Sequence, residues 1–211
     1  MDATGPVVLA VPDDDIDAAL RFAVAEAADH GSGLRLVAYD AAVLDRTLAR
    51  VRGVPAEGRI VQGTPVRAVL DASADARLVV VRRRDLLHLI RALTADNDVL
   101  PTGWSDPPVA CVPPDWEPPA EELPATLGIE HDEDCERLVA SAEVVCGAVT
   151  VRTVHLAHAR AGAELVALSA RSRLVLLGRN AADERGGTRL GRTARTVLHG
   201  SGCPVVMLPP R

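Results

Sequence analysis

The chain contains no lysine, so all 23 of its basic residues are arginines. This absence excludes every mechanism that needs a lysine amine, including the phosphate-binding loop of P-loop enzymes. Aromatic residues make up only 2% of the 211 residues, which leaves no platform on which nucleic-acid bases could stack. The formal net charge is −6, so the chain also lacks the general positive charge that neutralises phosphates. We therefore expect no nucleic-acid partner.

Long apolar runs and paired cysteines are missing as well. No apolar run approaches the roughly 20 residues that a membrane-spanning helix needs, so we expect no membrane association. The first six residues have neither the basic region nor the apolar core of a secretory signal. The four cysteines form no Cys-x-x-Cys pair, and we expect them to be reduced core residues. Together these features predict a cytoplasmic protein.

The sequence does contain the same ending twice. The block Arg-Leu-Val-Val-Val at 77–81 returns as Arg-Leu-Val-Leu-Leu at 173–177, and 173 − 77 = 96. The Pro-Val pair that opens 108–114 returns at the start of 204–210 with the same offset, as does the closing Pro-Pro pair. Two linked copies of one pattern predict a duplicated fold.

The two copies differ in length. When Val11 is aligned with Ile129, the offset at the start of the copies is 129 − 11 = 118. The later offset of 96 is smaller by 118 − 96 = 22 residues. That number corresponds to about one strand, one helix and their connections. The second copy is therefore predicted to lack one strand-helix unit and to keep four strands.

Apolar runs alternate with segments of helical periodicity along both copies, which predicts parallel sheets with helices on both faces. In the first copy we expect strands at 7–11, 34–39, 59–62, 77–81 and 109–112, with helices at 16–30, 41–52 and 64–72. In the second copy we expect strands at 125–129, 149–156, 173–177 and 205–208, with helices at 135–147, 161–170 and 193–199.

The two closing strands, 109–112 and 205–208, are short, apolar and flanked by proline. Proline cannot donate to a strand ladder, so each should be an edge strand of its own sheet. An apolar edge needs a cover. We therefore expect the two strands to pair with each other and to form an intramolecular pseudo-dimer.

Three stretches resemble the universal stress protein family: Val61-Gln62-Gly63-Thr64-Pro65, Gly128-Ile129-Glu130-His131-Asp132 and residues 171–210. The resemblance implies an α/β fold made of two flavodoxin-like parallel-sheet domains in tandem. These would be domain 1 at 1–114, a linker at 115–124 and the shortened domain 2 at 125–211. In the family, a strand-end Asp contacts the nucleotide and a later G-x2-G-x9-G-[S/T] loop binds its phosphates.

That nucleotide motif is only half present in the second copy. Gly178 and Gly191 match the first and third glycines, whereas Ala181 stands at the second and Arg192 replaces the Ser or Thr. Glu130 stands where the family has its Asp. The helix that follows Gly191 offers free N–H groups to an anion. If the resemblance extends to binding, the residues that hold ATP or AMP would be Glu130, Gly178, Gly191, Arg192 and Thr193.

The first copy has lost the motif. Arg82, Asp85 and Ala95 occupy the equivalent positions, and Asp96 would repel a phosphate from the start of its helix. We expect no nucleotide there. The run Arg82-Arg83-Arg84 is interpreted as the solvated end of a strand, with an anionic partner as the alternative.

The remaining polar clusters have ordinary structural interpretations. Asp13-Asp14-Asp15 is expected to cap the helix that follows it, and His131-Asp132-Glu133-Asp134 to form an acidic first helical turn instead of a metal site. His155 and His158 lack a third ligand for zinc. Ser201 lies between two glycines but lacks the G-x-S-x-G frame of a nucleophile elbow. The sequence therefore predicts no enzyme.

The resulting expectation is a non-enzymatic, universal stress protein-like regulatory or stress-response protein with degenerate nucleotide sites and no cofactor. It would act through contacts with a protein partner that the sequence does not identify. The alternative is an adenine-nucleotide sensor that binds ATP or AMP in its second domain.

Overall fold

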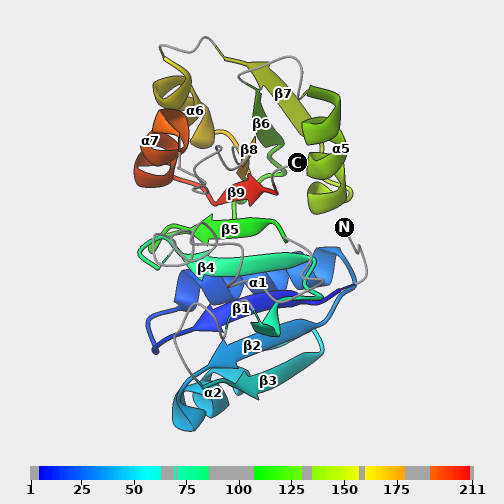
Figure 1. The fold of residues 1–211 in the computed structure, drawn as a ribbon, viewed down its shortest axis with the longest axis vertical. Coiled ribbons are helices and arrows are strands. Elements are labelled where there is room, and N and C mark those ends of the chain that lie inside the picture. Colours follow the sequence, from blue (N-terminus) through cyan, green and yellow to red (C-terminus); the bar gives the residue numbers. More distant parts are fainter. Residues whose placement is uncertain are drawn as a thin grey trace, which may run out of the picture.

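The structure is a computed structural model that describes residues 5–62, 69, 71–85, 107–129, 135–156, 160–178 and 191–209. Its strands form one sheet of nine, in the order β3-β2-β1-β4-β5-β9-β8-β6-β7 (Figure 1). Every neighbouring pair is parallel except β5 with β9. The predicted α/β, flavodoxin-like fold class is confirmed.

The strands are β1 (Val7–Val11), β2 (Leu34–Ala38), β3 (Ala56–Ile60), β4 (Leu78–Arg82), β5 (Val109–Val112), β6 (Ala125–Ile129), β7 (Val151–His155), β8 (Val175–Gly178) and β9 (Val205–Leu208). The helices of the described residues are α1 (Asp17–Asp29), α2 (Ala41–Leu48), α5 (Cys135–Cys146), α6 (Ala161–Ser169) and α7 (Arg192–Gly200). We call residues 5–112 the first half and residues 125–209 the second half.

The first half follows the strand order 3-2-1-4-5. Its third strand begins at Ala56, three residues earlier than the sequence predicts, because its pairing with β2 begins at Leu34↔Ala56. All five residues of β3 are exposed, so its own pattern carries little apolar signal. The helix predicted at 64–72 lies mostly outside the described residues.

The second half contains four strands in the described residues, as the 22-residue difference predicts. Its first strand, β6, occupies the predicted residues 125–129 and pairs with β7 on one side and β8 on the other. Both α6 and α7 lie on one side of these strands and α5 on the other (Figure 1). The sheet of this half therefore has helices on both faces, as a parallel sheet requires, although its last strand β7 is exposed or half-buried.

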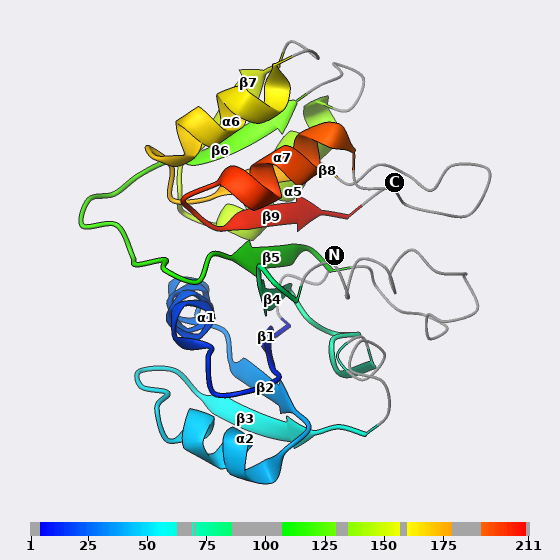
Figure 2. The same ribbon diagram turned by 90° about the vertical axis from the view of Figure 1, so that its left-hand side faces the viewer.

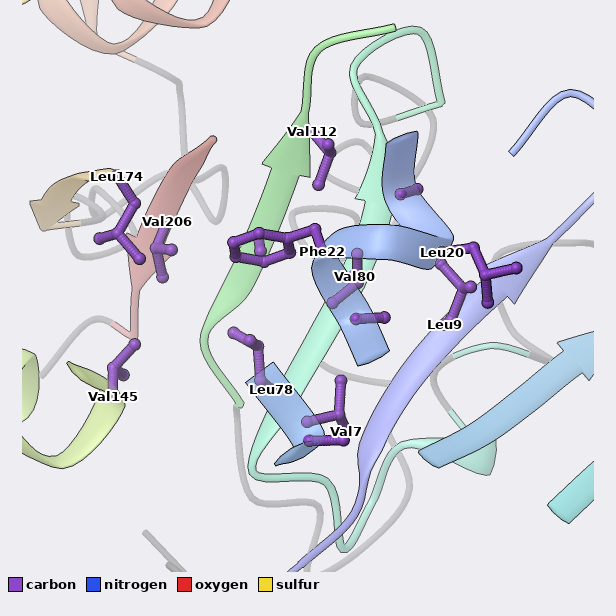
Figure 3. Close-up of a cluster of buried hydrophobic side chains, with 14 of the residues drawn as sticks. Val7, Leu9, Leu20, Phe22, Leu78, Val80, Val112, Val145, Leu174 and Val206 are labelled. Carbon is purple, nitrogen blue, oxygen red and sulfur yellow. The ribbon is translucent and has the colours of Figure 1, made fainter. Parts of the chain in front are cut away.

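Two apolar clusters fill the space between the sheet and its helices, and each contains residues of both halves. One cluster joins α1 and α5 across the sheet face, where Phe22 lies against β5 while Val145 and Val206 extend the cluster into the second half (Figure 3). The other joins strand residues of both halves with Leu165 of α6 and Val197 of α7. The two halves thus share their cores.

The closing strands β5 and β9 pair in the middle of the sheet, in opposite directions (Figure 2). Ala110 lies opposite Val206, and 110 + 96 = 206, so the central pair is a residue and its own repeat counterpart. The predicted pairing of the two closing strands is confirmed. Each of them is the last strand of its half, but neither is an edge of the whole sheet.

Two repeat-related arginines cross between the halves. Nη2 of Arg173, just before β8, lies 3.1 Å from Oε1 of Glu26 on α1, and it also bonds Asp29. Its counterpart Arg77, just before β4, places Nη2 3.3 Å from the carbonyl oxygen of Val144 on α5. An arginine of each half thus contacts a helix of the other half, as in an interface with two-fold symmetry.

The ends of α1 and α5 meet at the same boundary. Gly147 follows α5 with φ +57°, a left-handed conformation that favours glycine. A Cβ on Gly147 would also lie 2.8 Å from Cε1 of His30, the C-terminal cap of α1. Only glycine satisfies both requirements without a rearrangement.

The segment between β5 and β6 is attached to α1 at its start, which passes that helix before the chain turns toward β6 (Figure 2). Trp116 is buried and its ring meets Phe22 edge to face, with centroids 5.4 Å apart and an interplanar angle of 85°. Nη2 of Arg21 donates to the carbonyl oxygen of Trp116 at 2.9 Å and pairs with Glu117 at 2.9 Å. The start of this connection is therefore a packed part of the structure.

Candidate functional site

The crevice expected to hold a ligand lies at the carboxyl ends of β6 and β8, which are direct neighbours in the sheet. Gly178 is the last residue of β8, and α7 begins immediately after Gly191. Glu130 and the loop 179–190, which includes Ala181, lie outside the described residues. The structure therefore places four of the five predicted nucleotide-binding residues: three together at the start of α7, and Gly178 at the end of β8.

Gly178 packs against α5. A Cβ at this position would lie 2.9 Å from Cδ2 of Leu138, a buried residue of that helix. Such a contact is shorter than normal van der Waals separation, so the leucine would have to shift. The small size of Gly178 is therefore used for packing of α5 on β8, a reason that the repeat pattern alone does not reveal.

The start of α7 has an uncapped first turn. Gly191 is its N-cap residue, with φ −58° and ψ 164°, and no side chain caps the helix. The first regular bond runs from the N–H of Arg195 to the carbonyl oxygen of Gly191 at 3.1 Å. Arg192 is exposed and Thr193 is half-buried. Free N–H groups beside an arginine favour an anion, although a helix start alone does not define a binding site.

The equivalent crevice of the first half, between β1 and β4, is occupied by Arg82. This side chain is buried at the end of β4, where its Nε donates to Asp85 and its Nη1 donates to Asp13. Nη1 also donates to the carbonyl oxygen of Asp15 at 2.9 Å. The guanidinium thus bridges the residues that follow the two central strands.

Further ion pairs extend this arrangement toward solvent. Nη2 of Arg84 lies 3.1 Å from Oδ2 of Asp13, and its Nη1 lies 3.0 Å from Oδ2 of Asp15. Nη2 of Arg46, on α2, lies 2.8 Å from Oδ2 of Asp14. Asp13, Asp14 and Asp15 are therefore all paired with arginines of this chain.

The ion pairs shift the pKa values of their members. Burial alone would raise the pKa of Asp13, but hydrogen bonds from Arg82 and from the backbone of Asp15 bring it below its usual range. Burial alone would lower the pKa of Arg82, but the carboxylates of Asp85 and Asp13 raise it instead. Both groups are charged at neutral pH.

Two sequence predictions are wrong here. The run Asp13-Asp14-Asp15 does not cap α1, whose N-cap residue is Ile16 without a side-chain cap. Arg82 does not end in solvent, because the aspartates draw it into the crevice. One signal could have found this network: three aspartates follow β1 and three arginines begin at the end of β4, and the carboxyl ends of adjacent parallel strands lie side by side.

Ser201 and three of the cysteines, Cys111, Cys146 and Cys203, are buried in structural positions. Oγ of Ser201 is buried and bonds the carbonyl oxygen of Cys203 at 2.8 Å, in the turn between α7 and β9. Burial raises the pKa of the Cys111 and Cys146 thiols to about 12 and that of Cys203 to about 11, which keeps them protonated. Within the same residues, no group of three or more His, Cys, Asp or Glu side chains is placed to hold a metal ion.

Neither a protein-family model nor a curated protein matches the sequence. Solved structures do share its fold. A functionally unknown protein from Pseudomonas aeruginosa PAO1 superposes with a TM-score of 0.69 at 15% identity, covering 99% of this chain and 94% of that one. A protein from Pseudomonas aeruginosa UCBPP-PA14, described as a candidate universal stress protein, gives 0.66 at 12% identity over 98% and 94% of the two chains. A universal stress protein from Archaeoglobus fulgidus DSM 4304 gives 0.61 at 11% identity over 96% and 98%.

The chain thus has the flavodoxin-like α/β fold that these universal stress proteins have, over nearly its whole length. At such low identity the likeness concerns the fold and does not transfer an activity. In the part of the chain that the structure describes, no helix combines the length and the apolarity needed to cross a bilayer.

Proposed function

We propose that the chain is a universal stress protein-like regulatory protein that acts through protein contacts and catalyses no reaction. The observation that carries this proposal is the Arg82 side chain, which fills the crevice of the first half. A nucleotide entering there would have to displace a buried guanidinium from two carboxylates and would bring its phosphates toward Asp13 and Asp85. Such an exchange is unfavourable.

The symmetric pairing of β5 with β9 supports the interpretation of the chain as an internal pseudo-dimer of two related domains. The paired strands, the crossing arginines and the shared cores are the features common to both halves. The loops that would hold a phosphate are the features that differ. This distribution favours a protein whose role depends on the scaffold that the two halves form together, and not on a chemical site.

The alternative is an adenine-nucleotide sensor, and one observation favours it. The counterpart of Arg82 is Gly178, since 82 + 96 = 178, so no side chain fills the second crevice from that position. The uncapped start of α7 would offer N–H groups to phosphate. Against it stands the contact of Gly178 with Leu138, which explains this glycine without any ligand.

The two candidates are separated by mass spectrometry of the supernatant from the denatured protein, followed by calorimetry with ATP and with AMP. We expect no copurified nucleotide and no binding heat at millimolar nucleotide. ATP hydrolysis above the buffer rate would contradict the non-enzymatic part of the proposal.

Two matched substitutions locate any nucleotide that does bind. Gly191→Asp puts a negative charge at the start of α7 and should abolish phosphate binding there. Gly202→Asp makes the same change at an exposed glycine, where an added Cβ would meet no atom within 4 Å. Binding that is lost in the first variant and kept in the second would replace our proposal with the sensor.

A further inference from the structure

A chain of four contacting side chains lies at the boundary between the halves: Arg77, His30, Glu26 and Arg173. The side chain of His30, the C-terminal cap of α1, is only 8% exposed, and Glu26 lies one turn earlier on the same helix. Nη2 of Arg77 lies 2.8 Å from Nδ1 of His30, and Nε2 of the same ring lies 3.7 Å from Oε2 of Glu26. Arg173 of the second half contacts the other oxygen of Glu26. The two arginines that cross between the halves are therefore connected through one imidazole.

The contact with Arg77 defines the protonation state of the His30 ring. A guanidinium has only donors and stays charged in proteins, so the Nδ1 atom that it meets must accept the hydrogen bond. An imidazole that accepts at Nδ1 has no proton there. His30 is therefore neutral in this arrangement, with its one ring proton on Nε2, the nitrogen that faces Glu26.

The titratable groups around His30 come from both halves, and their charges balance while the ring is neutral. In the described residues they are two guanidiniums, two carboxylates and one thiol: Arg77 before β4, Arg173 before β8, Glu26 and Asp29 on α1, and Cys146 on α5. Burial raises the pKa of the Cys146 thiol to about 12, so it adds no charge. A second ring proton on His30 would therefore set three positive charges against two negative ones.

We propose that His30 is a pH-sensitive switch at the boundary between the two halves. A proton on Nδ1 points one donor at another, so the guanidinium of Arg77 has to move away. The same Nη2 atom of Arg77 also donates to the carbonyl oxygen of Val144 at 3.3 Å, and this contact with α5 is released together with the first. Histidine ordinarily changes its charge between about pH 5 and pH 8, so mild acid operates the switch.

The change is local, because the strands that join the halves contain no group that titrates in mild acid. The strands β5 and β9 have no histidine, carboxylate or arginine, so their pairing is kept. The end of α5 loses a contact with the first half beside Gly147, which packs against the His30 ring. The switch is independent of the proposed function, since it operates whether or not the second crevice binds a nucleotide.

Nitrogen NMR of the histidine rings tests the protonation state on the wild-type chain, because it distinguishes protonated from bare ring nitrogens. The chain has 6 histidines, and His30→Gln identifies the signals of His30 by removing them. At about pH 8 we expect a proton on Nε2 and none on Nδ1, and toward about pH 5 a proton on both. A proton on Nδ1 at the higher pH, or a ring that stays neutral at the lower one, would overturn the proposal.

A double-mutant cycle tests whether protonation breaks the contact with Arg77. Urea unfolding of His30→Ala, Arg77→Ala and the double variant, at about pH 8 and about pH 5, gives the coupling between the two side chains. We expect a coupling of about fivefold in the unfolding constant at the higher pH, as for one hydrogen bond, and none at the lower pH.

The matched control cycle pairs Arg77→Ala with His199→Ala, at an exposed histidine of α7. It should show no coupling at either pH. A coupling between His30 and Arg77 that is equal at the two pH values would contradict the switch, as would its absence at both.

Discussion

At the scale of single residues, two nearby arginines show how burial changes the contribution of an ion pair to the stability of the fold. Arg82 and Arg84 both bond Asp13, but their side chains are 10% and 55% exposed. The first is held among carboxylates in the crevice, and the second is largely hydrated. Removing Arg82 takes a shared guanidinium from Asp13 and Asp85, which are 51% and 30% exposed, and also removes the buried contacts of its stem, whereas the exposed pair of Arg84 is replaced by water at little cost.

The expected difference can be measured by urea unfolding followed by circular dichroism. Arg82→Ala should lower the free energy of unfolding by about 2–3 kcal/mol. Arg84→Ala serves as the matched control and should lower it by less than about 1 kcal/mol. Equal losses in the two variants would show that the crevice does not hold Arg82 as described.

The lowered pKa of Asp13 makes the same network sensitive to acid. Because the pKa is lower in the folded chain than the value of about 3.9 in the unfolded chain, the Asp13 carboxylate stabilises the fold above about pH 4. This contribution disappears as the pH falls through the folded pKa. The stability difference between the wild-type chain and Asp13→Asn should therefore shrink between pH 7 and about pH 3. Thermal unfolding at stepped pH would measure it, and a difference that grows toward acid pH would refute this sign.

At the scale of elements, the boundary between the halves combines a strand pair with two arginine contacts. The β5–β9 pair supplies the backbone bonds and a symmetric register. Arg173 then connects the start of β8 to α1 through Glu26, whose exposed fraction is 3%. A carboxylate that is so buried depends on its partner.

This dependence predicts that a double variant which removes both members of the pair is more stable than the variant that removes the arginine alone. Arg173→Ala should cost about 3 kcal/mol of unfolding free energy, because it leaves the buried Glu26 carboxylate with the longer contact to His30, at 3.7 Å. Adding Glu26→Gln removes that charge and should recover part of the loss. Arg171→Ala, at an exposed residue two positions earlier, is the control and should cost less than about 0.5 kcal/mol. A double variant less stable than Arg173→Ala would exclude this explanation.

The elements also show which parts of the fold a sequence can predict. Both β1 and β6 have the predicted bounds: β1 is an unbroken apolar run, and β6 is apolar or small except for the buried Thr126. The exposed strand β3 begins three residues before its predicted start, because pairing with β2 defines it and its first four residues are polar or small. Local pattern therefore predicts buried strands well and exposed strands poorly.

The candidate site was less predictable for the same physical reason. The sequence places Gly178 at the end of a strand, but its contact with Leu138, 178 − 138 = 40 residues away, depends on how α5 packs. The interaction of Arg82 with Asp13 spans 69 residues and depends on the adjacency of β1 and β4. The repeat pattern identifies the positions of Gly178 and Arg82. Their contacts with Leu138 and Asp13 can be recognised only when the arrangement of the strands and helices is known.

At the scale of the whole molecule, the two halves form one sheet with cores that cross the middle. The expectation of pairing between the closing strands rested on their proline flanks and apolar faces, and the structure adds the register, the crossing arginines and the docked Trp116. None of these three follows from a periodic pattern. Each involves residues that are distant in sequence; the register and the crossing arginines join the two halves, and Trp116 joins the connection to α1.

The segment from β5 to β6 has a further consequence for how chains meet each other. Because it tethers the halves, β5 finds β9 of its own chain at an effective concentration in the millimolar range, far above that of any other chain in dilute solution. Intramolecular pairing of β5 with β9 therefore outcompetes the exchange of halves between molecules. The strands in the middle of the sheet do not pair with those of another chain. Any further strand that joins the described sheet would have to do so beside β3 or β7, its two end strands.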